Sequence, residues 1–260
     1  MGIDRQGEDD TGPRAADSLR SAPPDLPDIP NGPVAPPPAA DDSAGSQTRA
    51  ERFSEYKAKV EAEYRREAVD RGCDRVREVE ETVVTPAMLR VEAEDPDRCL
   101  AGFDNRLKGK DRLAEKVTKA MEERGRTAEE ALASVKDAIR YTFQYADEKY
   151  AEGVYADCLR LEAAGFQRGD RQGTWESEQY KGINSRWREP ESGFLFEVQF
   201  HTQASFSAKQ ETHWAYEQLR QTDTELPDDE IRELRAYQRE VSVKVPIPPG
   251  ATEIPDYNYL

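Results

Sequence analysis

Hydrophobic and polar side chains alternate strictly over residues 196–201, a pattern that is typical of a β-strand. Phe196, Val198 and Phe200 occupy one face and are expected to pack into a core. The other face carries three polar side chains in a row: Glu197, Gln199 and His201. This second face either contacts water, as in many antiparallel sheets, or lines a site.

Similar patterns divide the rest of the folded region into helices and strands. Helices are predicted over residues 51–80, 86–94, from Asp111 onward, 149–164, 203–220 and 228–240. Strands are predicted over 138–145, 183–188 and 194–201, a polar loop over 168–179, and strand or loop over 103–108. The order predicts an α+β fold in which helices flank a mixed β-sheet.

Two local features refine these helices. Asp111 is expected to act as an N-cap, because its carboxylate can accept hydrogen bonds from the first backbone amides. The helix over 51–80 carries an apolar stripe that we expect to be buried on the rest of the domain. The stripe consists of Phe53, Tyr56, Val60 and Tyr64.

Composition separates a tail from the folded region. Residues 1–50 contain nine of the 17 prolines and no aromatic residue, so they are predicted to be a disordered Pro/Asp-rich tail. One folded domain is predicted over 51–245. It would comprise N-terminal helices over 51–95, a core over 100–220 and a C-terminal helix over 228–240, with an extended tail over 246–260.

The formal net charge of −16 argues against a protein that coats duplex nucleic acid, because phosphate contacts need a basic surface. No apolar segment predicts a membrane span or a secretory signal. The expected location is therefore the cytoplasm, or outside the cell by a route without an N-terminal signal peptide. The three cysteines lack metal-ligand spacing, so any metal is expected to be oxygen-bound magnesium rather than zinc.

Three clusters of side chains can carry chemistry. Arg106, Lys108 and Lys116 can converge on a polyphosphate near a helix start, although a solvated basic face would look the same. Asp137 opens a strand and can hold hydrated magnesium, or it can simply cap a turn, while Arg140 can clamp a phosphate.

The third cluster is Tyr180-Lys181-Gly182-Ile183-Asn184. A tyrosine beside a lysine and a glycine at the start of a strand can stack on a purine base, although a surface tyrosine packed on its neighbours is commoner. On the helix after the last strand, Lys209 is expected to be solvated. His213 and Trp214 are expected to pack at a junction between helix and sheet.

The order of these clusters resembles the synthetase domain of the RelA/SpoT alarmone enzymes. That family has an arginine and a lysine two apart, a lysine ten after the arginine, and an Asp that opens a strand. A Gly-Tyr-Arg-Ser-Leu-His element and a Glu-x-Gln-x-Arg-Thr strand follow. The resemblance covers residues 100–220 and implies the nucleotidyltransferase-like fold of these synthetases.

This chain departs from the family's motifs mostly in the part that the family uses to bind the nucleotide that accepts the pyrophosphate. Where the family has glycine, arginine, histidine and arginine, this chain has Gln179, Lys181, Asn184 and His201. The form Phe-Glu-Val-Gln-Phe-His-Thr looks most like the stand-alone nucleotide 3′-pyrophosphokinase branch. The chain shows no His-Asp motif of the companion hydrolase.

The resemblance implies transfer of pyrophosphate from ATP to the 3′-hydroxyl of a purine nucleotide, GDP or GTP, or AMP, ADP or ATP. It implies magnesium held by Asp137 and Glu197, with Glu197 also as the base. The implied ATP-binding residues are Arg106, Lys108, Lys116 and Arg140. The implied acceptor-binding residues are Tyr180, Lys181, Asn184, Gln199 and His201.

Two other functions stay open. One is a toxin of the same fold that pyrophosphorylates the 3′ end of tRNA, which would bring an immunity or antitoxin protein as a partner. The other is an inactive module that senses nucleotides, against which the retention of both Asp137 and Glu197 argues.

Overall fold

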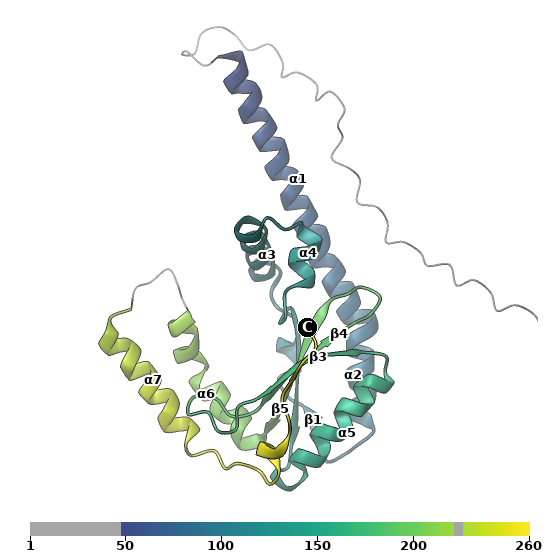
Figure 1. Ribbon diagram of the computed structural model, residues 1–260, viewed down its shortest axis with the longest axis vertical. Coiled ribbons are helices and arrows are strands. Elements are labelled where there is room, and N and C mark those ends of the chain that lie inside the picture. Colours follow the sequence, from purple (N-terminus) through teal and green to yellow (C-terminus); the bar gives the residue numbers. More distant parts are fainter. Residues whose placement is uncertain (1–47, 221–225) are drawn as a thin grey trace, which may run out of the picture. The chain divides into compact units, whose positions relative to one another are not determined.

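The computed structural model describes residues 48–220 and 226–260 (Figure 1). The predicted tail lies, up to residue 47, outside the described residues. The chain divides into two compact units, Met1–Lys57 and Ala58–Leu260. The described part of the first unit is the beginning of helix α1.

The helices and strands alternate along the chain. The α-helices are α1 (Arg49–Val79), α2 (Thr85–Ala93), α3 (Lys110–Arg124), α4 (Ala128–Ala133), α5 (Tyr150–Ala163), α6 (Gln203–Arg220) and α7 (Asp228–Ser242). A π-helical turn, η1 (Glu80–Val84), joins α1 to α2, and short 3-10 turns are η2 (Phe103–Asn105), η3 (Asp147–Lys149) and η4 (Ala251–Glu253). The strands are β1 (Arg98–Leu100), β2 (Ile139–Tyr145), β3 (Gln167–Gly173), β4 (Ile183–Arg188), β5 (Leu195–Thr202) and β6 (Tyr257–Asn258).

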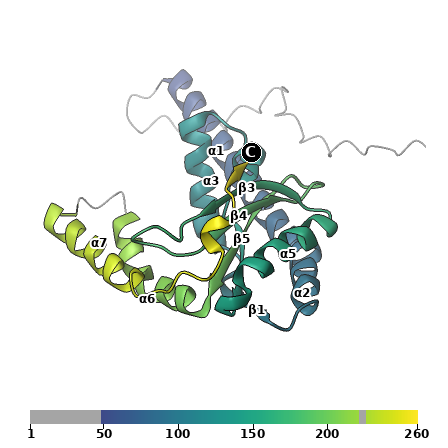
Figure 2. The same ribbon diagram turned by 60° about the horizontal axis from the view of Figure 1, so that its bottom comes forward.

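The strands form one six-stranded sheet in the order β1-β2-β5-β4-β3-β6. Strand β2 runs parallel to β5, and the other neighbours are antiparallel. Helices α2 and α5 lie on one side of the sheet and α6 and α7 on the other (Figures 1 and 2). The prediction of an α+β fold with a mixed sheet flanked by helices is confirmed.

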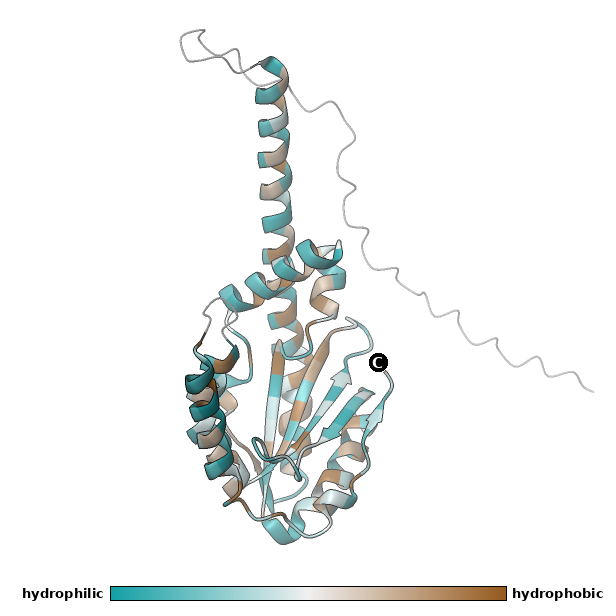
Figure 3. Ribbon diagram, turned by 60° about the vertical axis from the view of Figure 1, so that its left-hand side comes forward, coloured by the Kyte–Doolittle hydropathy of each residue, from teal (hydrophilic) through white to brown (hydrophobic). Residues whose placement is uncertain are grey.

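The two faces of the sheet differ in chemistry, and the strands carry both hydrophobic and hydrophilic colours along their length (Figure 3). On the face toward α5, the Phe196 ring packs edge-on against Phe166, and the Tyr150 hydroxyl of α5 donates to the Phe200 carbonyl. Phe196, Val198 and Phe200 are all buried, as the alternation predicts. The opposite face is polar and lies under α6.

A buried ionic network fastens α5 to the sheet and to the α2–β1 connection. Asp157 on α5 accepts hydrogen bonds from Arg98, from the Tyr145 hydroxyl at 2.6 Å and from Arg160 at 2.7 Å. The side chains of Arg98 and Asp157 are both completely buried. Two buried charges satisfied in this way hold the two elements in one arrangement.

The structure corrects four sequence-based expectations. Residues 167–173 form strand β3 instead of a loop, because pairing with both β4 and β6 satisfies a polar backbone. Helix α3 is capped by Gly109, and Asp111 lies within its first turn. The last fifteen residues are not a tail outside the domain, since they supply β6 and bury Ala251 and Ile254.

The fourth correction concerns the apolar stripe of α1. Phe53, Tyr56 and Val60 are exposed by 44%, 37% and 39% rather than buried. Tyr64 is half-buried. The helix is buried further along, through Val69, Cys73 and Val76. Helical periodicity marks an apolar face but does not say what covers it.

Candidate active site

Polar side chains form rows across the three central strands, on the face beneath α6. Each row is set by register, because directly paired residues point to the same face of a sheet. Glu197 pairs with Arg140 on β2 and with Arg186 on β4. The next rows are Thr142, Gln199 and Asn184, and then Gln144 and His201.

Asp137 lies just before β2, and its carboxylate forms ion pairs with two lysines. Lys116 on α3 donates to one carboxylate oxygen at 2.6 Å, and Lys108 lies 3.2 Å from the other. Lys108 reaches this position because its backbone amide bonds to the Ala138 carbonyl. Although burial acts to raise the pKa of Asp137, these two ammonium groups hold it below its usual value. The carboxylate is therefore ionised at neutral pH.

Glu197 lies deeper, in the middle of β5. Burial raises the pKa of its carboxyl group, and the charge of Asp137 adds to this, while Arg140 opposes it. The Gln199 amide donates to one oxygen of Glu197 at 2.5 Å. A carboxylate whose pKa is raised toward neutrality is suited to accept a proton from a substrate.

Tyr180, Asn184 and His201 form one hydrogen-bonded group. The Tyr180 hydroxyl donates to Asn184 Oδ1 at 2.9 Å and lies 2.8 Å from His201 Nε2. The other ring nitrogen of His201 is 2.8 Å from the Ser205 hydroxyl on α6. Burial holds the pKa of His201 well below its usual value, so the imidazole is neutral. The structure thus brings three predicted acceptor residues together.

Gly182 makes this arrangement sterically feasible. Its φ is +153°, and a Cβ there would lie 2.8 Å from His201 Cε1 and 3.2 Å from the Phe200 carbonyl oxygen. We expect Gly182→Ala to lower the melting temperature and to displace the His201 ring from Tyr180. Thermal denaturation and the imidazole proton resonances of His201 test this. Gly109→Ala, where a Cβ would meet nothing within 4 Å, is the control. Unchanged resonances in Gly182→Ala would contradict the expectation.

Two predicted site residues make their contacts elsewhere. Arg106 bonds through Nε to Glu80 at 2.6 Å and stacks over the Phe103 ring at 4.3 Å. Lys181 donates to the Trp175 carbonyl at 2.7 Å. Neither hydrogen bond involves another member of the predicted set. Arg140 remains central, opposite Glu197, and its guanidinium group forms no hydrogen bond or ion pair within the described ranges.

Sequence reasoning missed two residues. Glu80, buried in the π-helical turn, accepts bonds from Arg106, Thr85 and Tyr141 and so orients Arg106. Lys209 on α6 is not solvated as expected, because its ammonium group donates to Gln199 Oε1. Helical spacing could have indicated this position, because Lys209 lies four residues after Ser205 and three before Thr212, which are both on the buried side of the helix.

His213 and Trp214 do not pack at a junction between helix and sheet. His213 is exposed and stacks on Tyr216, with ring centroids 6.5 Å apart. Trp214 is 55% exposed and lies against Tyr237 of α7.

The chemistry of the two predicted metal ligands fits magnesium. Asp137 and Glu197 offer carboxylate oxygens, which magnesium prefers, and magnesium sites commonly use one or two carboxylates with substrate phosphates. Across residues 48–220 and 226–260 no group of three or more His, Cys, Asp or Glu side chains could hold a metal. Nor is any helix in these ranges long and apolar enough to span a membrane.

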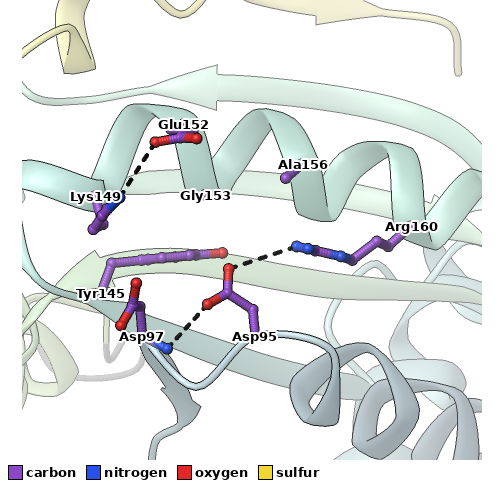
Figure 4. A pocket seen from close by; sticks show the side chains of 8 residues that line it. All are labelled: Asp95, Asp97, Tyr145, Lys149, Glu152, Gly153, Ala156 and Arg160. Atoms are coloured by element: carbon purple, nitrogen blue, oxygen red, sulfur yellow. Dashed lines mark hydrogen bonds and ion pairs between the residues drawn. The ribbon is translucent and has the colours of Figure 1, made fainter.

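A separate pocket lies beside α5, by the sheet face that packs on this helix (Figure 4). In two of its charged pairs, the partners lie within 4 Å of each other. Lys149 pairs with Glu152 at 3.7 Å, and Arg160 pairs with Asp95 at 3.9 Å. This pocket shares no residue with the predicted site.

Several solved structures are similar to this chain, and three of them are described here. The small alarmone synthetase 1 of Bacillus subtilis, bound to its product pppGpp, is 17% identical, with 64% of this chain and 87% of that chain covered and a TM-score of 0.40. A GTP pyrophosphokinase family protein of Streptococcus pneumoniae is 12% identical, with 70% and 87% covered and a TM-score of 0.38. The protein smu.1046c of Streptococcus mutans UA159 is 18% identical, with 64% and 86% covered and a TM-score of 0.40.

The remaining comparisons are negative. No family model matches the chain, and no curated protein matches it.

Proposed function

We propose that this protein transfers pyrophosphate from ATP to the 3′-hydroxyl of a purine nucleotide and releases AMP. The observation that carries the proposal is that two carboxylates, Asp137 just before β2 and Glu197 on β5, each lie beside cations. Lys108 and Lys116 surround the first carboxylate, and Arg140 stands opposite the second. In a chain of net charge −16, such a local concentration of cations favours a polyanionic substrate.

The cations around Asp137 would bind the ATP phosphates. Lys108 and Lys116 approach Asp137 from the segment before α3 and from α3 itself, so a polyphosphate lying there would meet two ammonium groups. Arg140, which has no ion pair within the described ranges, would clamp the group that is transferred. Arg106, oriented by Glu80, would contact the ATP from the edge of β2.

Glu197 would act as the general base. In the proposed step, the acceptor 3′-oxygen attacks the β-phosphorus, and the bond from that phosphorus to the α–β bridging oxygen breaks. The bridging oxygen leaves with AMP, and the 3′-hydroxyl proton passes to Glu197. Its raised pKa suits this transfer, because a base works best when its pKa lies nearer the working pH.

Magnesium would be held by Asp137 and Glu197, together with oxygens of the ATP phosphates. When bound, it would neutralise part of the phosphate charge. The protein's own groups would then fix the reacting atoms in line, which is most of what phosphoryl-type transfer demands of an enzyme.

The acceptor base would stack on Tyr180. We expect Tyr180→Ala to weaken acceptor binding by roughly 1 to 3 kcal/mol, which is the usual value of an aromatic–base stack, and to leave ATP affinity nearly unchanged. Tyr180→Phe keeps the ring and loses only the hydroxyl bonds to Asn184 and His201, so it should bind the acceptor better than the alanine variant. A fall in ATP affinity instead would place Tyr180 in the donor half.

The assay that tests the proposal uses γ-labelled ATP, magnesium and separate pools of AMP, ADP, GDP, GTP and deacylated tRNA. The proposal predicts label in one or more of the free nucleotides. Label in the tRNA alone would assign the tRNA-directed activity. Nucleotide binding without any transfer would assign a sensor module.

A further inference from the structure

Lys209 occupies a position on α6 that points it toward the polar sheet face. Ser205, Thr212 and Ala215 mark the buried side of this helix, and Lys209 falls between the first two at helical spacing. Its ammonium group donates to Gln199 Oε1, and Gln199 in turn donates to Glu197. Lys209 is half-buried.

Among the residues that the structure describes, the charge of Lys209 has no carboxylate partner. Within residues 48–220 and 226–260 no Asp or Glu oxygen lies within 4.0 Å of its ammonium group, whereas Lys108 and Lys116 both reach Asp137. Burial, together with repulsion from Arg140, lowers the pKa of Lys209 to about 8, although Glu197 acts in the opposite direction. Holding an unpaired cation out of water is costly, and an anionic ligand would offset that cost.

Lys209 adjoins the predicted acceptor residues rather than the lysines around Asp137. The Phe206 ring is near both Lys209 and His201: the ammonium nitrogen is 5.4 Å from its centroid, and the centroid of the His201 ring is 5.9 Å away. His201 then contacts Tyr180. A line of contacts therefore joins Lys209 to the tyrosine on which the acceptor base would stack.

The strand itself supplies no positive charge at this point. His201, at the position where the resembled motif has an arginine, is completely buried, neutral and engaged through both ring nitrogens. Lys209 is the nearest cation on α6 that could replace it, since Arg220 lies three turns further on and stacks over Tyr216.

We propose that Lys209 binds a phosphate group of the acceptor nucleotide. This inference rests on the proposed function and extends it, since it makes the acceptor a nucleoside phosphate and assigns the contact to helix α6. An ammonium group has three donors, of which Gln199 occupies one, so two remain for phosphate oxygens.

The test measures binding rather than turnover. Isothermal titration calorimetry of the full chain near pH 7, saturated with magnesium and α,β-methylene-ATP, would compare GDP and ADP with guanosine and adenosine. The analogue blocks transfer because a methylene group replaces the α–β bridging oxygen, which is the atom that must leave with AMP. We expect Lys209→Met to weaken GDP or ADP binding by at least about tenfold, the value of one lost charge-assisted bond. Nucleoside binding should change less than about twofold.

Two variants serve as references. Lys209→Arg keeps the charge and should retain most of the nucleotide affinity. Lys244→Met removes an exposed lysine outside the site that pairs with Glu240, so it should bind as the wild type does. Melting temperatures of all variants establish that they are folded, and Lys209→Gln replaces the methionine variant if that one is unstable.

Each outcome decides the inference. Wild-type affinity for GDP and ADP in Lys209→Met would overturn it, as would an equal loss for nucleosides. A matching loss of α,β-methylene-ATP affinity would place Lys209 in the donor half and also overturn it. A wild-type protein that binds none of the probes would overturn it too. If phosphate-dependent binding needs Lys209 while the wild type transfers no label from ATP, the inference stands and the proposed function falls.

Discussion

Glu197→Gln and Asp137→Asn are each expected to lower the rate of pyrophosphate transfer by roughly a thousandfold while the protein stays folded. Each change removes a charge that the transition state needs but preserves the size of the side chain. Glu197→Gln removes the proton acceptor, and Asp137→Asn releases Lys108 and Lys116 from the group that positions them. Single-turnover rates at saturating ATP and acceptor would measure the loss.

Two exposed carboxylates provide matched controls for these changes. Glu148→Gln and Asp228→Asn make the same chemical substitutions outside the site, so both should keep wild-type rates. Circular dichroism would show whether all four variants are folded. Normal transfer by either site variant would show that its carboxylate is not part of the reaction.

The largest effect on stability is expected from Asp157→Asn. Asp157 receives hydrogen bonds from Arg98, Arg160 and Tyr145, and the Arg98 side chain is completely buried. Neutralising the carboxylate leaves the buried guanidinium group of Arg98 with only the partly exposed Asp95 carboxylate as a counter-charge, 3.9 Å away. We expect the free energy of unfolding to fall by about 3 to 5 kcal/mol, measured by urea denaturation at neutral pH.

Asp95→Asn is the control for that experiment. The Asp95 carboxylate lies 3.9 Å from both Arg98 and Arg160, but it is partly exposed. Water screens such pairs, so the loss should stay below about 1 kcal/mol. An equal loss in the two variants would mean that burial of the Arg98–Asp157 pair is not what holds α5 in place.

The central strands could be predicted from the sequence because their side chains alternate strictly. In β5, Phe196, Val198 and Phe200 alternate with Glu197, Gln199 and His201, and β2 behaves in the same way. Strand β3 could not be predicted, because Gln167–Gly173 is polar and contains two glycines. It is ordered by neighbours on both sides, of which β6 lies more than 80 residues further on.

Site residues could be predicted where they belong to sequence motifs in a known order. They could not be predicted where contacts between distant elements place them. The sequence grouped Tyr180, Asn184 and His201, and the structure brings them within hydrogen-bond distance. No sequence pattern predicted that Glu80 would lie beside Arg106, because Glu80 is placed there by the π-helical turn. The sequence around Lys209 is that of an ordinary solvated helix lysine. Only the packing of α6 on the sheet shows that its ammonium group points to Gln199.

The most direct test of the central claim follows both ends of ATP in one reaction. Parallel incubations with ATP labelled at the α or at the γ phosphate, with magnesium and a mixture of GDP, GTP, AMP and ADP, would be resolved by chromatography. The account predicts α label in AMP and an equal amount of γ label in an acceptor nucleotide that now carries a 3′-pyrophosphate. Recovery of the α label in ADP, or of the γ label only as free phosphate or pyrophosphate, would contradict it.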